Sequence, residues 1–128
     1  MTGLGELIRA RLLAHAGTAA LAGARVYPLL IPQETPTVPA VTYLLGTLAE
    51  TDGSAPLWQE TVETTCWAAD DAAAQGLAKE VEEALSGWGA VGATLRLLRM
   101  DLTGYQPSYD ETVDLWGVTL RWNAWVAR

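Results

Sequence analysis

The sequence has little of the chemistry that builds metal and redox sites. It contains one cysteine, Cys66, and one histidine, His15, and it has no phenylalanine. A single cysteine excludes an internal disulfide and any metal site made from a cysteine cluster. Cys66 lies in a strand-like run, so we expect it to be a small buried apolar residue. Because no second histidine or cysteine is near His15 in the sequence, we expect no metal or catalytic role for it.

Long hydrophobic runs and common catalytic motifs are also missing. No apolar run approaches the ~20 residues of a membrane span. The first helical stretch carries Glu6, Arg9 and Arg11 where a secretory signal would be apolar, so we expect a soluble intracellular protein. There is no GxSxG elbow, phosphate loop or GxGxxG motif. The sequence therefore predicts no catalytic, cofactor-binding or metal-binding residues, and favours a binding or assembly role over an enzyme.

Positive charge is absent from a long central span. No Lys or Arg occurs between Arg25 and Lys79, and the net charge of the chain is −7. The acids of this span are Glu34, Glu50, Asp52, Glu60, Glu63, Asp70 and Asp71. Sequence-specific DNA binding is disfavoured, because phosphate contacts need clustered Lys or Arg. The span is either an ordinary solvated face or a surface that repels nucleic acid or steers a basic partner.

The length of the chain predicts a single domain, residues 1–128, and half of its residues are hydrophobic. Four of the six prolines lie between Arg25 and Pro39, which predicts a stiff extended arm, because proline fixes its own φ and biases the preceding residue toward extended geometry. Residues 40–48 then read as a strand, rich in valine, threonine, tyrosine and leucine. The arm and strand would suit contact with a neighbour, or an ordinary loop before a core strand.

The spacing of apolar residues predicts the remaining helices and strands. Apolar spacing predicts helices over residues 4–16, with His15 in the last turn, and from Asp70 or Asp71 to about Leu85. Thr18 is expected to cap one further turn over 19–22. Strands are predicted over 57–67, 94–102 and 113–126, with a possible edge strand at 25–27 and a loop at 86–92. The parity of apolar residues shifts after Leu97, which indicates a β-bulge.

This order of elements predicts an α+β fold: a mostly antiparallel sheet of about four to five strands with two helices packed on one face. One face of strand 57–67 is only partly apolar, so we expect a half-solvated strand. Two polar, turn-rich segments, 49–56 and 103–112, are predicted to be exposed loops. They supply the candidate residues for a partner or ring interface: Glu50, Asp52, Tyr105, Tyr109 and Glu111. The two tyrosines can serve as contact anchors or pack back on their own domain.

Several motifs together resemble a known family. They are Arg-Val-Tyr-Pro (25–28), Pro-Gln-Glu-Thr-Pro (32–36), Pro-Ala-Val-Thr-Tyr (39–43), and Thr-Cys-Trp-Ala (65–68) leading into the acidic and alanine-rich helix 70–85. This pattern is similar to the tail-completion, or tail-terminator, family of long-tailed bacteriophages and prophage-derived particles. The resemblance covers nearly the whole chain, and its motifs are structural.

The resemblance implies a small α+β subunit that forms a hexameric ring. The ring would cap the finished tail tube at its head-proximal end, stop its polymerisation and form the tail side of the head–tail joint. Implied partners are the major tail tube protein and the head–tail connector proteins. DNA would pass through the channel without specific binding, with the acid-rich span as a candidate lining. The resemblance implies assembly in the host bacterial cytoplasm, no membrane contact and no enzymatic activity.

Two other functions remain open at this stage. A head–tail connector or neck adaptor of similar size would bind the portal side instead of the tube. A small α+β enzyme or ligand-binding domain would place a tryptophan-lined pocket between its sheet and helices. Gene neighbourhood would separate the first of these from a terminator, and a monomer with a bound metabolite would support the second.

Overall fold

The computed structural model describes residues 3–31, 37–50, 57–92 and 95–127, with 47–50 described by backbone alone. The helices are α1 (Leu4–Ala14), α2 (Ala16–Ala22) and α3 (Asp71–Leu85), and the strands are β1 (Val26–Pro28), β2 (Ala40–Glu50), β3 (Leu57–Ala68), β4 (Ala90–Val91), β5 (Arg96–Asp110) and β6 (Leu115–Ala127). None of the helices in these ranges is long and apolar enough to cross a membrane.

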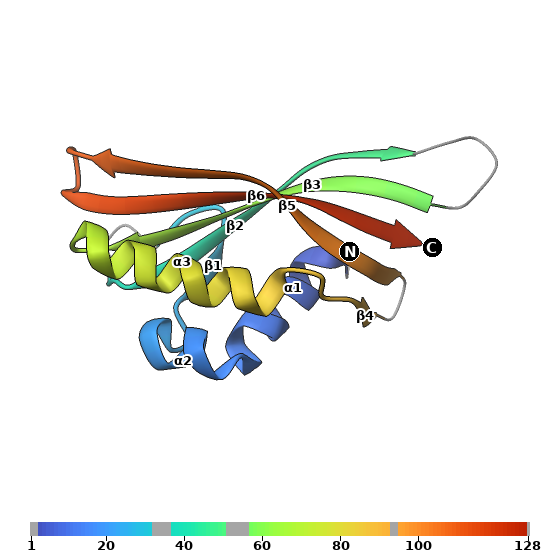
Figure 1. The fold of residues 1–128 in the computed structure, drawn as a ribbon, viewed down its shortest axis with the longest axis horizontal. Coiled ribbons are helices and arrows are strands. Elements are labelled where there is room, and N and C mark those ends of the chain that lie inside the picture. The colour runs from blue at the N-terminus through green and yellow to red at the C-terminus, as the bar shows by residue number, and fades with distance from the viewer. Residues whose placement is uncertain (1–2, 32–36, 51–56, 93–94, 128) are drawn as a thin grey trace.

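The strands form one strongly twisted sheet in the order β1-β2-β3-β6-β5-β4 (Figure 1). β1 pairs with β2 in parallel, and every other pairing is antiparallel. All three helices lie on one face of the sheet, where α3 packs on β3 and β6 while α1 packs on β1 and β2. The predicted class, a mostly antiparallel α+β fold with its helices on one face, is confirmed.

The predicted number of elements was too low, because the described residues form a sheet of six strands and three helices. β4 lies inside the predicted loop 86–92, where two residues become a strand only because they pair with Leu97 and Arg96 of β5. The predicted helix 4–16 is interrupted at His15, whose backbone is extended, so α2 is a separate helix. His15 therefore caps the start of α2 instead of lying in the last turn of α1.

The predicted loop 103–112 was also wrong, because β5 continues through it to Asp110. Residues 104–110 pair residue by residue with β6 up to Leu115. Gly104 and Pro107 are weak strand formers, which is why the sequence indicated a loop, but pairing with β6 overrides that preference. Pro107 is tolerated because no described residue pairs with this stretch of β5 on its outer side. The predicted bulge after Leu97 is confirmed by a register shift between Leu97 and Arg99.

The core lies between the sheet and the helices. Alternate residues of β6, including Val118, Leu120, Trp122, Ala124 and Val126, are buried, because successive side chains of a strand point to opposite faces of the sheet. The strand β3 was predicted to be half-solvated, and its burial alternates in the same way: the face with Val62 and Cys66 is buried under α3, and the other face is half-buried or exposed. Thr64 on the buried face is fully buried. Its hydroxyl is satisfied there because it accepts a hydrogen bond from Nε1 of Trp122 at 3.0 Å.

Cys66 is fully buried in this core, as predicted, and burial raises the pKa of its thiol well above the usual range. Because the thiolate is the reactive form, we expect Cys66 of the folded protein not to react with an aromatic disulfide reagent at pH 8. In about 6 M guanidinium chloride one thiol per chain should react within minutes. The absorbance of the aromatic thiol released from the reagent measures the reaction in the folded protein and in guanidinium chloride. Rapid reaction of the folded protein would contradict the buried placement.

Candidate assembly interface

An apolar groove lies at one end of the molecule, on the sheet face that carries no helix. It has a volume of about 150 Å³ and is lined by Leu29, Leu30, Ile31, Thr42, Trp67, Asp110, Val113 and Leu115. The residues come from the segment after β1, from β2 and β3, and from the β5–β6 hairpin. Leu29, Leu30 and Val113 are 62%, 61% and 43% exposed. Exposed leucine and valine side chains gathered around one groove are typical of a surface that another chain covers. We call these lining residues the end groove.

Local backbone geometry explains why two leucines face solvent here. Pro28 ends β1, and Leu29 follows with φ of +71°, a left-handed conformation that is unusual for a bulky residue. The amide of Leu29 donates to the carbonyl of Tyr43 at 2.9 Å, and the amide of Leu30 donates to that of Pro28 at 2.8 Å. These bonds hold the turn in place. Strained backbone of this kind is found mainly where function requires it.

A second apolar surface lies toward the other end of the sheet, around β4 (Figure 1). Val91 is 79% exposed and Leu98 is 41% exposed. Leu98 also lines a shallow hollow with Leu57, Arg99 and Trp125. We call Val91, Leu98, Leu57 and Trp125 the β4 surface. The domain thus presents two different apolar surfaces, one toward each end of its long axis.

The five interface residues predicted from the sequence do not form one surface. Tyr105, Tyr109 and Glu111 are exposed on β5 and the turn after it. Glu50 ends β2 and is paired with Trp58, whereas Asp52 lies outside the described residues. Through the pairing of β3 with β6, the Glu50 end of the sheet is ten β6 residues away from Trp116, the partner of Tyr109. At ~3.3 Å per residue this is a separation of about 33 Å.

The two tyrosines are held by their own domain. The Tyr109 hydroxyl donates to Oδ1 of Asp114 at 2.6 Å, which raises the pKa of Tyr109, and its ring centroid lies 4.8 Å from that of Trp116. The Tyr105 hydroxyl donates to the side-chain oxygen of Gln75 on α3. Desolvation and then the charge of Asp71 raise the pKa of Tyr105. Of the alternatives left open above, packing on the same domain is what the contacts show, and their role as anchors stays a prediction.

The end groove was not predicted as a site. Leu29 and Leu30 lay within the predicted proline arm, and Val113 was assigned to the last strand instead of the turn. The only signal available was a pair of adjacent leucines directly after a strand-ending proline.

The structure also brings together His15, Glu80 and Glu83, three residues that could hold a metal ion.

A small α+β domain with exposed apolar surfaces toward both ends is typical of proteins that associate with other chains. A family comparison gives the class a name: residues 6–127 match the model of the family "Tail completion protein gp17", and the chain belongs to that family. The resemblance seen in the sequence is confirmed, and the protein is a structural protein of a phage-type tail.

Comparison with solved structures agrees on the fold. A chain of the structure titled "Virion of native gene transfer agent (GTA) particle" superposes with a TM-score of 0.78 at 24% sequence identity. The alignment covers 98% of this chain and 95% of that chain, so the likeness extends over the whole domain. The comparison with curated proteins finds no match.

Proposed function

We propose that this protein is a tail terminator: six copies form a ring that caps the finished tail tube, stops its polymerisation and forms the tail side of the head–tail joint. The observation that carries the proposal is membership of the tail-completion family over residues 6–127. On this proposal the ring lies at the head-proximal end of the tail and contacts the tube protein on one side and the connector proteins on the other. Its role is structural, without catalysis.

The two apolar surfaces support a ring. A head-to-tail ring needs two different surfaces on each subunit, because each contact joins one surface of a copy to a different surface of the next copy. The end groove and the β4 surface are made of different residues and lie toward opposite ends of the long axis. We propose that the β4 surface of one copy, with Val91 and Leu98, covers the end groove of the next. A stable contact of this kind buries on the order of 800 Å² per partner.

Charge supports passage of DNA without binding. The chain carries −7, so a ring of six carries −42. The described acids of the 25–79 span do not share one face: Glu63 lies on the helix-free face beside Arg121, Asp70 and Asp71 lie at the start of α3, and Glu60 lies on the helix-facing side. We therefore propose that the net charge of the ring, and not one acidic wall, repels the DNA backbone.

The mass in solution, measured by light scattering at low and high salt, tests the proposal. A ring of six has a mass of about 82 kDa, six times the 13.7 kDa of the chain. We expect the ring to be favoured at about 0.5 M salt, because screening weakens repulsion between subunits that each carry −7. If the protein is monomeric at both salts, adding the tail tube protein should produce capped tubes that stop growing.

A protein that stays monomeric and never appears at the end of the tube would overturn the terminator proposal. Binding to connector proteins with no affinity for the tube would assign the neck-adaptor role instead. Negative-stain images of tubes grown with and without the protein distinguish these results, because only a terminator shortens the tubes in proportion to its concentration.

A further inference from the structure

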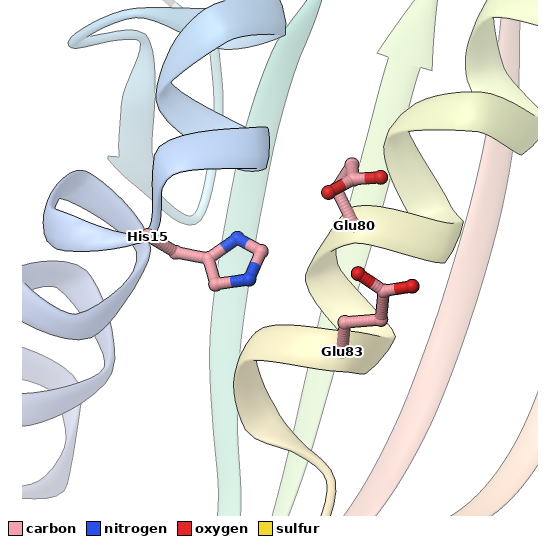
Figure 2. A group of neighbouring side chains, drawn as sticks. All are labelled: His15, Glu80 and Glu83. Carbon is pink, nitrogen blue, oxygen red and sulfur yellow. The ribbon is translucent and has the colours of Figure 1, made fainter.

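Three potential metal ligands meet on the helical layer, away from both apolar surfaces. His15, at the junction of α1 and α2, faces Glu80 and Glu83 of α3 (Figure 2). One ligand atom from each of the three side chains lies within 4.8 Å of the others. His15 and Glu80 are half-buried, and Glu83 is exposed. The group therefore combines one imidazole with two carboxylates from a separate helix.

The imidazole of His15 is held in position by the start of α2. The amide of Thr18 donates to Nδ1 of His15 at 3.3 Å, so His15 caps α2, and Oγ1 of Thr18 lies 3.1 Å from the same nitrogen. Thr18 is fully buried, which fixes this contact. Because Nδ1 lies against Thr18, Nε2 is the ring nitrogen left for a ligand on the α3 side, and it can bind a metal when the ring proton is on Nδ1.

The two carboxylates are held close to the imidazole. Glu80 and Glu83 are three residues apart on α3, so both project from the same face of that helix. Gly17, the second residue of α2, lets Glu80 approach, because a Cβ at position 17 would collide with the Glu80 carboxylate. A side chain larger than hydrogen would push Glu80 away from His15.

Neither carboxylate is neutralised by a basic side chain in the part of the chain that the structure describes. The ion pairs there join Arg99 to Asp101 and Arg121 to Glu63. Arg11 reaches α3, but its Nε donates to the carbonyl of Ala84 at 2.8 Å, and its guanidinium lies over the ring of Trp88. A half-buried Glu80 beside a second carboxylate is costly without a cation. The position therefore favours a bound positive charge.

We propose that His15, Glu80 and Glu83 bind a divalent transition-metal ion, with Zn²⁺ as the best fit. One imidazole and two carboxylates supply three ligands at 2.0–2.2 Å, and a water would complete the tetrahedron. Ligand atoms around such an ion are about 3.3 Å apart, so the side chains must close by at most about 1.5 Å, which rotation of the exposed Glu83 allows. Metal binding at Nε2 requires the tautomer with the proton on Nδ1, which then donates to Oγ1 of Thr18 and no longer accepts from the Thr18 amide. The ion therefore replaces the capping hydrogen bond of His15 with a bond to α3.

The ion would connect the start of α2 to the C-terminal half of α3. Both helices belong to the layer that covers the sheet, so the bound ion stabilises the folded domain by mass action. This role is independent of the proposed ring function, since the site lies apart from the end groove and the β4 surface.

Thermal unfolding of EDTA-treated and then dialysed protein, with and without ZnCl₂, tests the site. At about one hundred times the dissociation constant, we expect Zn²⁺ to raise the Tm by roughly 8–12 °C. Titration calorimetry should give one ion per chain. His15→Asn keeps a good helix-capping acceptor but removes Nε2, so this variant should fold and lose the shift. Glu83→Gln should lose most of the shift.

The matched control is Glu82→Gln, which makes the same charge change on the same helix outside the group and should keep the full shift. No shift in the unaltered protein would overturn the proposal. So would an equal shift in the control, in His15→Asn and in Glu83→Gln, because that pattern means diffuse attraction of Zn²⁺ to surface acids. Each variant is compared with its own metal-free Tm, so a change in basal stability does not affect the reading.

Discussion

Replacing Leu30 by aspartate is expected to weaken association between copies of this protein by at least about 30-fold and to leave the folded monomer intact. Leu30 is 61% exposed in the monomer, so its side chain contributes little to the core. In the proposed ring it would be covered in the end groove, beside Asp110. An unpaired carboxylate buried there costs at least about 2 kcal/mol, which corresponds to that factor.

The matched control is Leu21→Asp. Leu21 is also an exposed leucine, at 41%, but it lies on α2, away from the groove. Both variants add one negative charge per chain, so general repulsion between subunits is equal in the two. A dilution series followed by light scattering, at about 0.5 M salt, measures association. Equal weakening in both variants would show that charge alone is responsible, and no weakening by Leu30→Asp would exclude the end groove from the ring contact.

Replacing Trp122 by alanine is expected to reduce the free energy of unfolding by about 3–5 kcal/mol. Trp122 is 1% exposed in the middle of β6, and its indole nitrogen donates to the buried hydroxyl of Thr64 at 3.0 Å. The change removes the largest side chain of the core and leaves Thr64 without a partner, so a cavity and an unsatisfied hydroxyl add together. Trp122→Phe keeps much of the side-chain volume, so its free energy of unfolding should lie between those of the unaltered protein and Trp122→Ala.

Trp116→Ala is the matched control on the same strand. Trp116 is 36% exposed and contacts the ring of Tyr109, so we expect a loss of about 1 kcal/mol. Urea unfolding measures the free energy of unfolding of both variants. It is followed by circular dichroism, because replacing a tryptophan changes the fluorescence signal itself. A loss from Trp116→Ala as large as that from Trp122→Ala would contradict the assigned core.

Several local features were predictable because short-range physics decides them. Asp70 caps α3 by accepting from the amide of Ala73 at 2.7 Å, as an acid before an apolar helical stripe indicates. The period of two in β6 indicated a strand, and alternate residues from Val118 to Val126 are buried. The apolar parity after Leu97 predicted the bulge. In each case the information lies within a few neighbouring residues.

Pairing and packing between distant segments decided the rest. β5 extends through Gly104 and Pro107 only because β6 offers it a partner strand, which local propensity does not report. The end groove exists because the turn after β1 and the β5–β6 hairpin meet at the same end of the sheet.

The sequence by itself determined the α+β class, the helix α3, the buried strand β6 and the family resemblance, since all of these follow from local pattern. Only the tertiary structure decided that His15 faces Glu80 and Glu83, and that Leu29, Leu30 and Val113 share one groove. The physical reason is that such neighbours are far apart in the chain. Their distance in space is set by the packing of helices on the sheet and by strand register, neither of which is encoded in a local window of residues.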